Sequence, residues 1–66
     1  MNNKIRVARA EVRMTQQQLA DAADVSRQTI NAIESGKFVP STVLALKMAQ
    51  IFRKAVEEIF FLDEED

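Results

Sequence analysis

Apolar residues recur with helical spacing from Thr15 to Gly36, and capping residues divide this segment into two helices. Thr15 with Gln18 three residues later matches a capping box, and Ser26 supplies a second N-cap. Only the segment 23–25 lies between the helices, so a tight turn must join them. Gly36 is expected to end the second helix. The pattern predicts two short helices that cross rather than run antiparallel.

The second of these helices, over residues 27–34, has one aliphatic side and one polar side. Ile30 and Ile33 fall together and are expected to be buried. The outward-facing candidates for contact with DNA bases are Arg27, Gln28, Asn31 and Ala32. Arg can bind a guanine edge, Gln or Asn can bind an adenine edge, and a small Ala leaves room for a thymine methyl. The same composition also suits an ordinary solvated helix face, so the flanking sequence must decide between the two.

A further helix is predicted to open at Ser41, and its apolar residues cover a wide arc of about 220°, against about 100° for one packing partner. One apolar stripe contains Ala45, Leu46, Ala49 and Phe52, and the other contains Leu44, Met48 and Ile51. We therefore expect two partners for this helix. One is the domain core, and the other is either the last helix, predicted over Val56–Phe60, or a second copy of the chain.

Phe61 and Leu62 follow that last helix and are unfavourable to expose in so small a protein. Association with a second copy would cover them, and small scaffolds also gain stability by association. We therefore predict a homodimer, with its dimerisation elements within about residues 43–62. The candidate interface residues are Leu44, Met48, Ile51, Phe61 and Leu62.

The 66 residues, with one Gly, one Pro and 47% hydrophobic content, indicate a single domain over 1–66 with one helical core. The absence of Cys and His removes disulfides, thiolate metal sites and the commonest general base. We find no catalytic motif and expect no enzyme activity, cofactor, metal or small-molecule ligand. The longest apolar runs are four residues, so we expect neither a secretory signal nor a membrane span, and a cytoplasmic location.

Charge is segregated along the chain, although the net charge is only -1. Residues 1–54 hold all nine Lys and Arg with four acidic residues, whereas residues 55–66 hold six acidic residues. Screening acts over about 8 Å at physiological salt, so a distant acidic end need not cancel a basic patch. The acidic end is either a frayed, solvated terminus or a device against non-specific DNA binding.

A set of short motifs is spread over the chain from Ile5 to Phe60. It comprises Arg9 six residues before Thr15–Gln16, then Leu19–Ala20, Val25–Ile30, Ile33–Glu34, Gly36–Lys37 and Pro40–Ser41. In this arrangement the chain resembles the lambda-repressor-like, Cro and xenobiotic-response-element (XRE) family of helix-turn-helix proteins. The resemblance implies an all-α fold of five short helices, a helix-turn-helix unit over about residues 15–36, and insertion of Ser26–Glu34 into the major groove. It also allows the chain ends to pair as short strands, and it implies an ion pair between Arg9 and Glu34 that links the first helix to the third.

The chain departs from the family pattern at four positions. Asp24, Arg13 and Arg53 stand where the family often has Gly, which implies a left-handed backbone at each. Asp tolerates that conformation well, whereas Arg costs on the order of 1 kcal/mol more than Gly. Ala55 replaces a common Ser or Thr cap, so the last helix is expected to begin weakly.

Phosphate contacts are expected to flank the base contacts, because backbone anchoring sets the register while base edges set the sequence preference. Gln16 lies in the first turn of its helix, where the positive helix end favours a phosphate. Gln17 is expected to point outward and Gln18 to be occupied by the capping box. The candidate phosphate contacts are Gln16, Ser26, Thr29, Lys37 and Arg6.

Together these features predict a homodimeric transcription regulator that binds a near-palindromic operator in double-stranded DNA, most simply as a repressor. An antitoxin or a restriction-system controller that regulates its own gene is the alternative within DNA binding. A helical adaptor that binds another protein through Leu44, Met48 and Phe61 is the alternative outside it.

Overall fold

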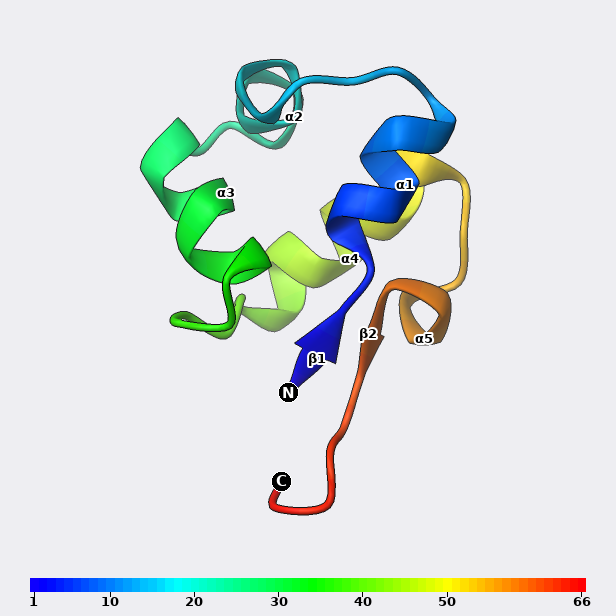
Figure 1. The fold of residues 1–66 in the computed structure, drawn as a ribbon. Coiled ribbons are helices and arrows are strands. Elements are labelled where there is room, and N and C mark those ends of the chain that lie inside the picture. The colour runs from blue at the N-terminus through cyan, green and yellow to red at the C-terminus, as the bar shows by residue number, and fades with distance from the viewer.

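The computed structural model describes residues 1–66 as five helices and two short strands. In chain order the elements are β1 (Asn2–Asn3), α1 (Ile5–Glu11), α2 (Gln16–Ala23), α3 (Arg27–Glu34), α4 (Thr42–Phe52), α5 (Val56–Ile59) and β2 (Phe60–Phe61). The two strands bring the chain ends together as an antiparallel pair below the helices, with Asn2 opposite Phe61 and Asn3 opposite Phe60 (Figure 1). This confirms the expected all-α fold with a short pairing of the chain ends.

Both predicted caps are present in the helix-turn-helix unit. The Thr15 hydroxyl accepts from the Gln18 backbone N–H at 3.0 Å, and the Gln18 side chain accepts from the Thr15 N–H at 2.8 Å. The Ser26 hydroxyl accepts from the Thr29 N–H at 3.1 Å. The turn begins one residue later than expected, because Ala23 is buried and belongs to α2.

The left-handed positions implied by the resemblance are confirmed. Arg13, Asp24 and Arg53 have φ of 56°, 60° and 55°. At Ala55 the cap comes from another residue, because the Glu58 carboxylate accepts from the Ala55 N–H at 2.9 Å. Helix α5 ends at Ile59, one residue before the predicted end, because the backbone of Phe60 turns into β2.

One core of 13 side chains draws on all five helices and on β2, and no buried side-chain nitrogen or oxygen lacks a partner. Helix α4 packs against both α2 and α5, and this buries part of its wide apolar arc while Val43 and Leu46 stay exposed. Leu44 and Met48 are 8% and 0% exposed. Their prediction as dimer-interface residues is therefore corrected: these side chains fill the core and do not reach the surface. Of the other candidates, Ile51 and Phe61 are half-buried and Leu62 is 75% exposed.

Relief of the left-handed strain at Arg53 should stabilise the fold. This conformation costs an L-residue about 1–2 kcal/mol, and the greater unfolded-state freedom of Gly offsets about half of that. We expect Arg53→Gly to raise the free energy of unfolding by about 0.5–1 kcal/mol in urea titrations. Arg53→Ala keeps the Cβ clash and should give no gain; equal gains in both variants would contradict the argument.

Candidate nucleic-acid interface

The exposed face of α3 borders a shallow polar groove between α2 and α3. The groove has a volume of about 590 Å³ and is lined by Gln16, Gln17, Ser26, Arg27, Gln28 and Asn31. These side chains offer hydrogen-bond donors and acceptors, and none of them is acidic. The structure thus gathers three of the predicted base contacts with two of the predicted phosphate contacts. A polyanion could approach this groove without meeting a carboxylate from its lining.

The remaining predicted contacts on this side lie toward the C-terminal end of α3. A second hollow of about 390 Å³ is lined by Gln28, Thr29, Ala32, Lys37 and Phe38. Gln28 belongs to both hollows, so the two form one continuous surface along α3. Arg6 stands apart on α1 with its side chain 79% exposed.

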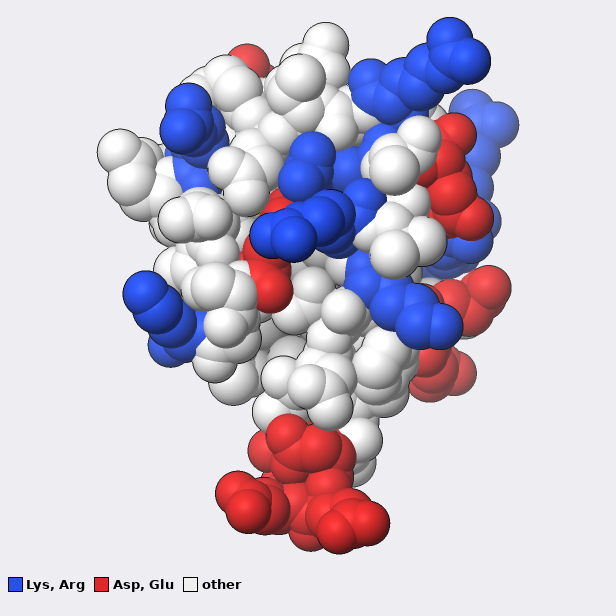
Figure 2. Space-filling view, in the orientation of Figure 1, with Lys and Arg blue, Asp and Glu red and all other residues white.

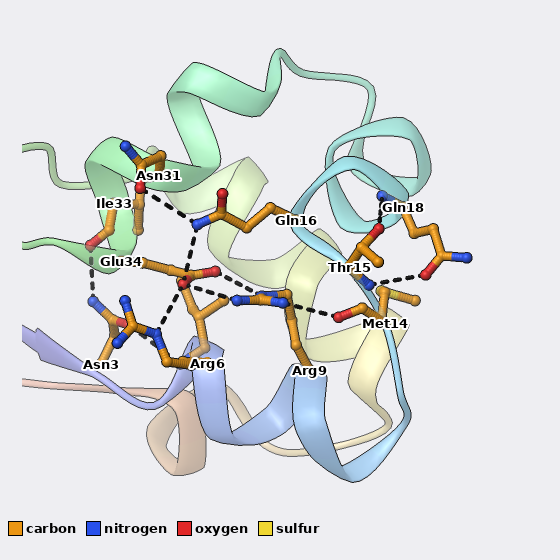
Figure 3. A network of polar contacts seen from close by, with 11 residues as sticks. Asn3, Arg6, Arg9, Met14, Thr15, Gln16, Gln18, Asn31, Ile33 and Glu34 are labelled. Atoms are coloured by element: carbon orange, nitrogen blue, oxygen red, sulfur yellow. Dashed lines mark hydrogen bonds and ion pairs between the residues drawn. The ribbon is translucent and has the colours of Figure 1, made fainter.

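Glu34, the last residue of α3, is held by the predicted ion pair with Arg9 of α1 (Figure 3). Arg9 donates from Nε to Oε2 of Glu34 at 2.7 Å and from Nη2 to Oε1 at 3.1 Å. Its third donor, Nη1, reaches the backbone carbonyl of Met14 at 2.9 Å. The Glu34 and Arg9 side chains are 2% and 15% exposed. This directional two-bond contact fixes α3 against α1 and against the loop that leads into α2.

Gln16 extends this network from α2 toward the exposed face of α3. Its Nε2 lies 3.4 Å from Oδ1 of Asn31 and 3.4 Å from Oε1 of Glu34. These long hydrogen bonds are weak, so the Gln16 amide can exchange them for a phosphate. Arg6 approaches the same carboxylate, with its Nε 3.6 Å from Oε1 of Glu34.

Opposing effects set the pKa of Glu34. Burial raises the pKa, but hydrogen bonds from Arg9 and Gln16 and the positive charges of Arg9 and Arg6 lower it by more. The net result is a pKa below the ordinary value of 4.5. Glu34 is therefore ionised at neutral pH, and its charge belongs to the scaffold of α3.

Asn3 and Gln17 take part in this region although neither was among the predicted contacts. The Asn3 amide donates to the carbonyl of Ile33 at 2.9 Å, while its oxygen accepts from the N–H of Ile5 at 3.2 Å. β1 is thereby tied to the end of α3, a contact between segments 30 residues apart that no local pattern shows. Gln17 lines the groove, and its side-chain amide donates to the Asp21 carboxylate at 2.9 Å. The four-residue spacing of Gln17 and Asp21 on one helix could have predicted this hydrogen bond from the sequence.

The acidic side chains at the C-terminal end lie apart from the basic side chains. Figure 2 shows Lys and Arg over the upper and middle parts of the molecule, with some carboxylates among them, while a cluster of carboxylates projects at the lower end, beyond β1 and β2. The acidic residues 63–66 follow β2 and account for that end. The acidic residues 63–66 are thus separated from the basic residues in space as well as in the sequence.

Comparisons with known proteins agree with this architecture. A helix-turn-helix family model matches residues 5–59, and the chain belongs to this family. Over all 66 residues and the full length of both proteins, it is 42% identical to YgzD of Bacillus subtilis and 46% identical to MJ0272 of Methanocaldococcus jannaschii. A protein of Archaeoglobus fulgidus is 44% identical, with 93% of its length covered. All three are described as uncharacterised HTH-type transcriptional regulators.

The structure was also searched for metal-ligand clusters and for membrane-spanning helices. No group of three or more His, Cys, Asp or Glu side chains is arranged to hold a metal ion. None of the helices has both the length and the apolar composition needed to span a membrane.

Removal of Arg9 should destabilise the protein in a pH-dependent way. Arg9→Met leaves a buried carboxylate without its main partner, so we expect a loss of about 3 kcal/mol in the free energy of unfolding at pH 7. In the wild type, the contribution of Glu34 is present above pH 4.5 and is lost as the pH falls through its lowered folded-state pKa. In the variant, burial then raises the folded-state pKa, so protonation favours the folded form.

The deficit of Arg9→Met relative to the wild type should therefore shrink as the pH falls from 7 toward 4.5, which denaturant titrations at several pH values can measure. Arg6→Met is the matched control, because Arg6 is 79% exposed and its surface pair contributes little. A deficit that stays constant with pH would contradict a buried, ionised Glu34.

Proposed function

We propose that this protein is a sequence-specific, double-stranded DNA-binding transcriptional regulator that inserts α3 into the major groove. The observation that carries the proposal is the exposed, acid-free face of α3, on which Arg27, Gln28 and Asn31 project from a helix held on its other side by Ile30 and Ile33. Membership of the helix-turn-helix family and the descriptions of the relatives as transcriptional regulators support it.

In the proposed complex, the N-terminal half of α3 supplies the main base contacts. Arg27 and Gln28 can each form two hydrogen bonds to a base edge, to guanine and adenine respectively. Asn31 offers a further adenine contact, and Ala32 leaves space for a thymine methyl.

Phosphate contacts flank this face on both sides. Gln16 and the free N–H groups at the start of α2 meet one strand, with Ser26 and Thr29 at the start of α3. Lys37 meets the DNA backbone beyond the other end of α3, and Arg6 provides an exposed cation on α1. This sorting assigns specificity to the exposed face of α3 and register to its surroundings.

We further propose a homodimer that represses transcription by binding a near-palindromic operator, with half-sites about one helical turn, ~34 Å, apart. The exposed apolar side chains of Val39, Val43, Leu46 and Leu62 support association, because a second copy could remove their surface from water. A helical adaptor is not proposed, because Leu44 and Met48, two of its three expected contact residues, are buried.

Footprinting of the purified protein on DNA around its own gene tests the function directly. Protection of two half-sites on one face of the duplex supports the proposal. Uniform, salt-sensitive binding without a protected site would overturn sequence-specific regulation there.

Substitution of the base contacts should reduce specificity more than overall affinity. We expect Arg27→Ala or Gln28→Ala to cost about 1–3 kcal/mol of specific binding and to relax preference at one base position, as measured by competition between operator and random DNA. Gln50→Ala is the matched control, since Gln50 is exposed on α4 and lines neither hollow beside α3. Unchanged discrimination in both α3 variants would show that α3 does not contact the bases.

Substitution of Lys37, the proposed phosphate contact, should reduce the affinity for all DNA sequences to a similar extent. We expect Lys37→Ala to weaken binding to operator and random DNA to a similar extent and to reduce the salt slope by about 1 per subunit. Lys54→Ala removes a cation that instead pairs with Glu11 at 3.3 Å, so its slope should match the wild type. Equal slopes for Lys37→Ala and the wild type would place Lys37 away from the DNA backbone.

A further inference from the structure

Phe38, in the loop between α3 and α4, carries an exposed aromatic ring beside the proposed DNA-contacting face of α3. Its side chain is 52% exposed and does not belong to the core. It is the only aromatic side chain among the exposed large apolar ones. A single exposed apolar residue is common on protein surfaces and needs no explanation by itself. The position of this ring, however, is set by the end of α3.

The backbone after α3 holds Phe38 against the last turn of that helix. Gly36 has a φ of 80°, and this left-handed conformation turns the chain back along the helix. The N–H groups of Lys37 and Phe38 then both donate to the carbonyl of Ala32, at 2.9 Å and 3.2 Å. This hydrogen-bonded helix ending ties the position of Phe38 to that of Ala32.

The ring of Phe38 is one wall of the shallow hollow of about 390 Å³ beside α3, whose other lining residues are Gln28, Thr29, Ala32 and Lys37. Gln28 and Ala32 are four residues apart and therefore lie on the same face of the helix. Phe38 and Ala32 give the hollow an apolar part, while Gln28 and Lys37 add a hydrogen-bonding amide and a cation. No acidic residue lines it, so a polyanion can approach.

This combination of side chains matches the major-groove edge of a thymine. Among the four bases of DNA, only thymine presents a methyl group there, and small apolar or aromatic side chains are its usual contacts. A methyl group between Phe38 and Ala32 leaves Gln28 free for a neighbouring base edge and Lys37 free for the DNA backbone. Without the ring, Ala32 alone would offer the methyl group only a small contact surface.

We propose that Phe38 is a specificity-determining residue whose ring packs against the C5-methyl group of a thymine and holds it over Ala32. The inference rests on the proposed DNA-binding function, and it adds a residue from outside α3 to the base contacts. The contact selects thymine through its methyl group and needs no hydrogen bond from Phe38. Thymine is therefore preferred at a position adjacent to the base that Gln28 contacts.

Replacement of single thymines by uracil in the operator found by footprinting tests this contact, because uracil lacks only the C5-methyl group. At one position of a half-site, we expect uracil to weaken wild-type binding about fourfold, the effect of one buried methyl group. Phe38→Ala should bind the thymine operator more weakly than the wild type and should bind the thymine and uracil operators equally at that position. Its helical circular dichroism should be unchanged, since the ring lies outside the core.

Val12→Ala is the matched control, because Val12 is 48% exposed and lines neither hollow beside α3. It should keep both the affinity and the uracil response of the wild type. A wild type that discriminates operator from random DNA but tolerates uracil at every position would overturn the inference and leave the proposed function intact. The inference also fails if Phe38→Ala keeps the full uracil response, since the ring would then act on the sugar-phosphate backbone or on folding. A wild type without any discrimination between operator and random DNA would overturn the proposed function itself.

Discussion

The contact on which the arrangement of this protein depends is the ion pair between Glu34 and Arg9. Glu34 is the last residue of α3, and its carboxylate is almost fully removed from solvent. A charge in that position needs strong partners, because the loss of hydration costs several kcal/mol. Arg9 supplies two hydrogen bonds and uses its third donor on the Met14 carbonyl. One guanidinium thus joins α1, the loop before α2 and the end of α3.

This contact matters because α3 is too short to hold its geometry alone. A helix of eight residues is marginal in water, so its position must come from tertiary contacts. Ile30 and Ile33 anchor one side in the core, Glu34 anchors the end, and Asn3 adds a hydrogen bond from β1 to the Ile33 carbonyl. The backbone of α3 is thereby held in place, and its polar face presents the exposed side chains of Arg27, Gln28 and Asn31. A geometry fixed before binding is what specific contact with base edges requires.

The proposed DNA-contacting face and most of the exposed large apolar side chains lie on separate parts of the chain. The proposed DNA-contacting face belongs to α2, α3 and the adjoining Lys37 and Phe38, whereas the exposed apolar side chains of Val39, Val43 and Leu46 belong to α4 and the loop before it. Figure 2 shows the carboxylates of the C-terminal end set apart from the basic side chains, which lie on α1, α3 and α4 and the segments beside them. Salt screens exposed charges over about 8 Å, so an acidic end that lies away from the proposed DNA-contacting face repels DNA phosphates only weakly. A net charge of -1 is therefore compatible with a polyanionic partner.

The sequence by itself determined the helix boundaries to within a residue or two, because Thr15, Ser26 and Ser41 act on backbone groups only three residues away. It also determined which side of α3 is exposed, since helical periodicity sorts Ile30 and Ile33 from Arg27, Gln28 and Asn31. The left-handed positions and the Arg9–Glu34 pair were available only through family resemblance.

Only the tertiary structure decided which side of α4 is buried. Its apolar residues cover so wide an arc that periodicity could not separate core from surface, and packing against α2 and α5 buried Met48 while leaving Val43 and Leu46 exposed. The tie from Asn3 to α3 was equally beyond the sequence, because it joins residues 30 positions apart. Local patterns encode short-range hydrogen bonds and faces, but the choice among apolar faces depends on the shape of the partner that each one meets.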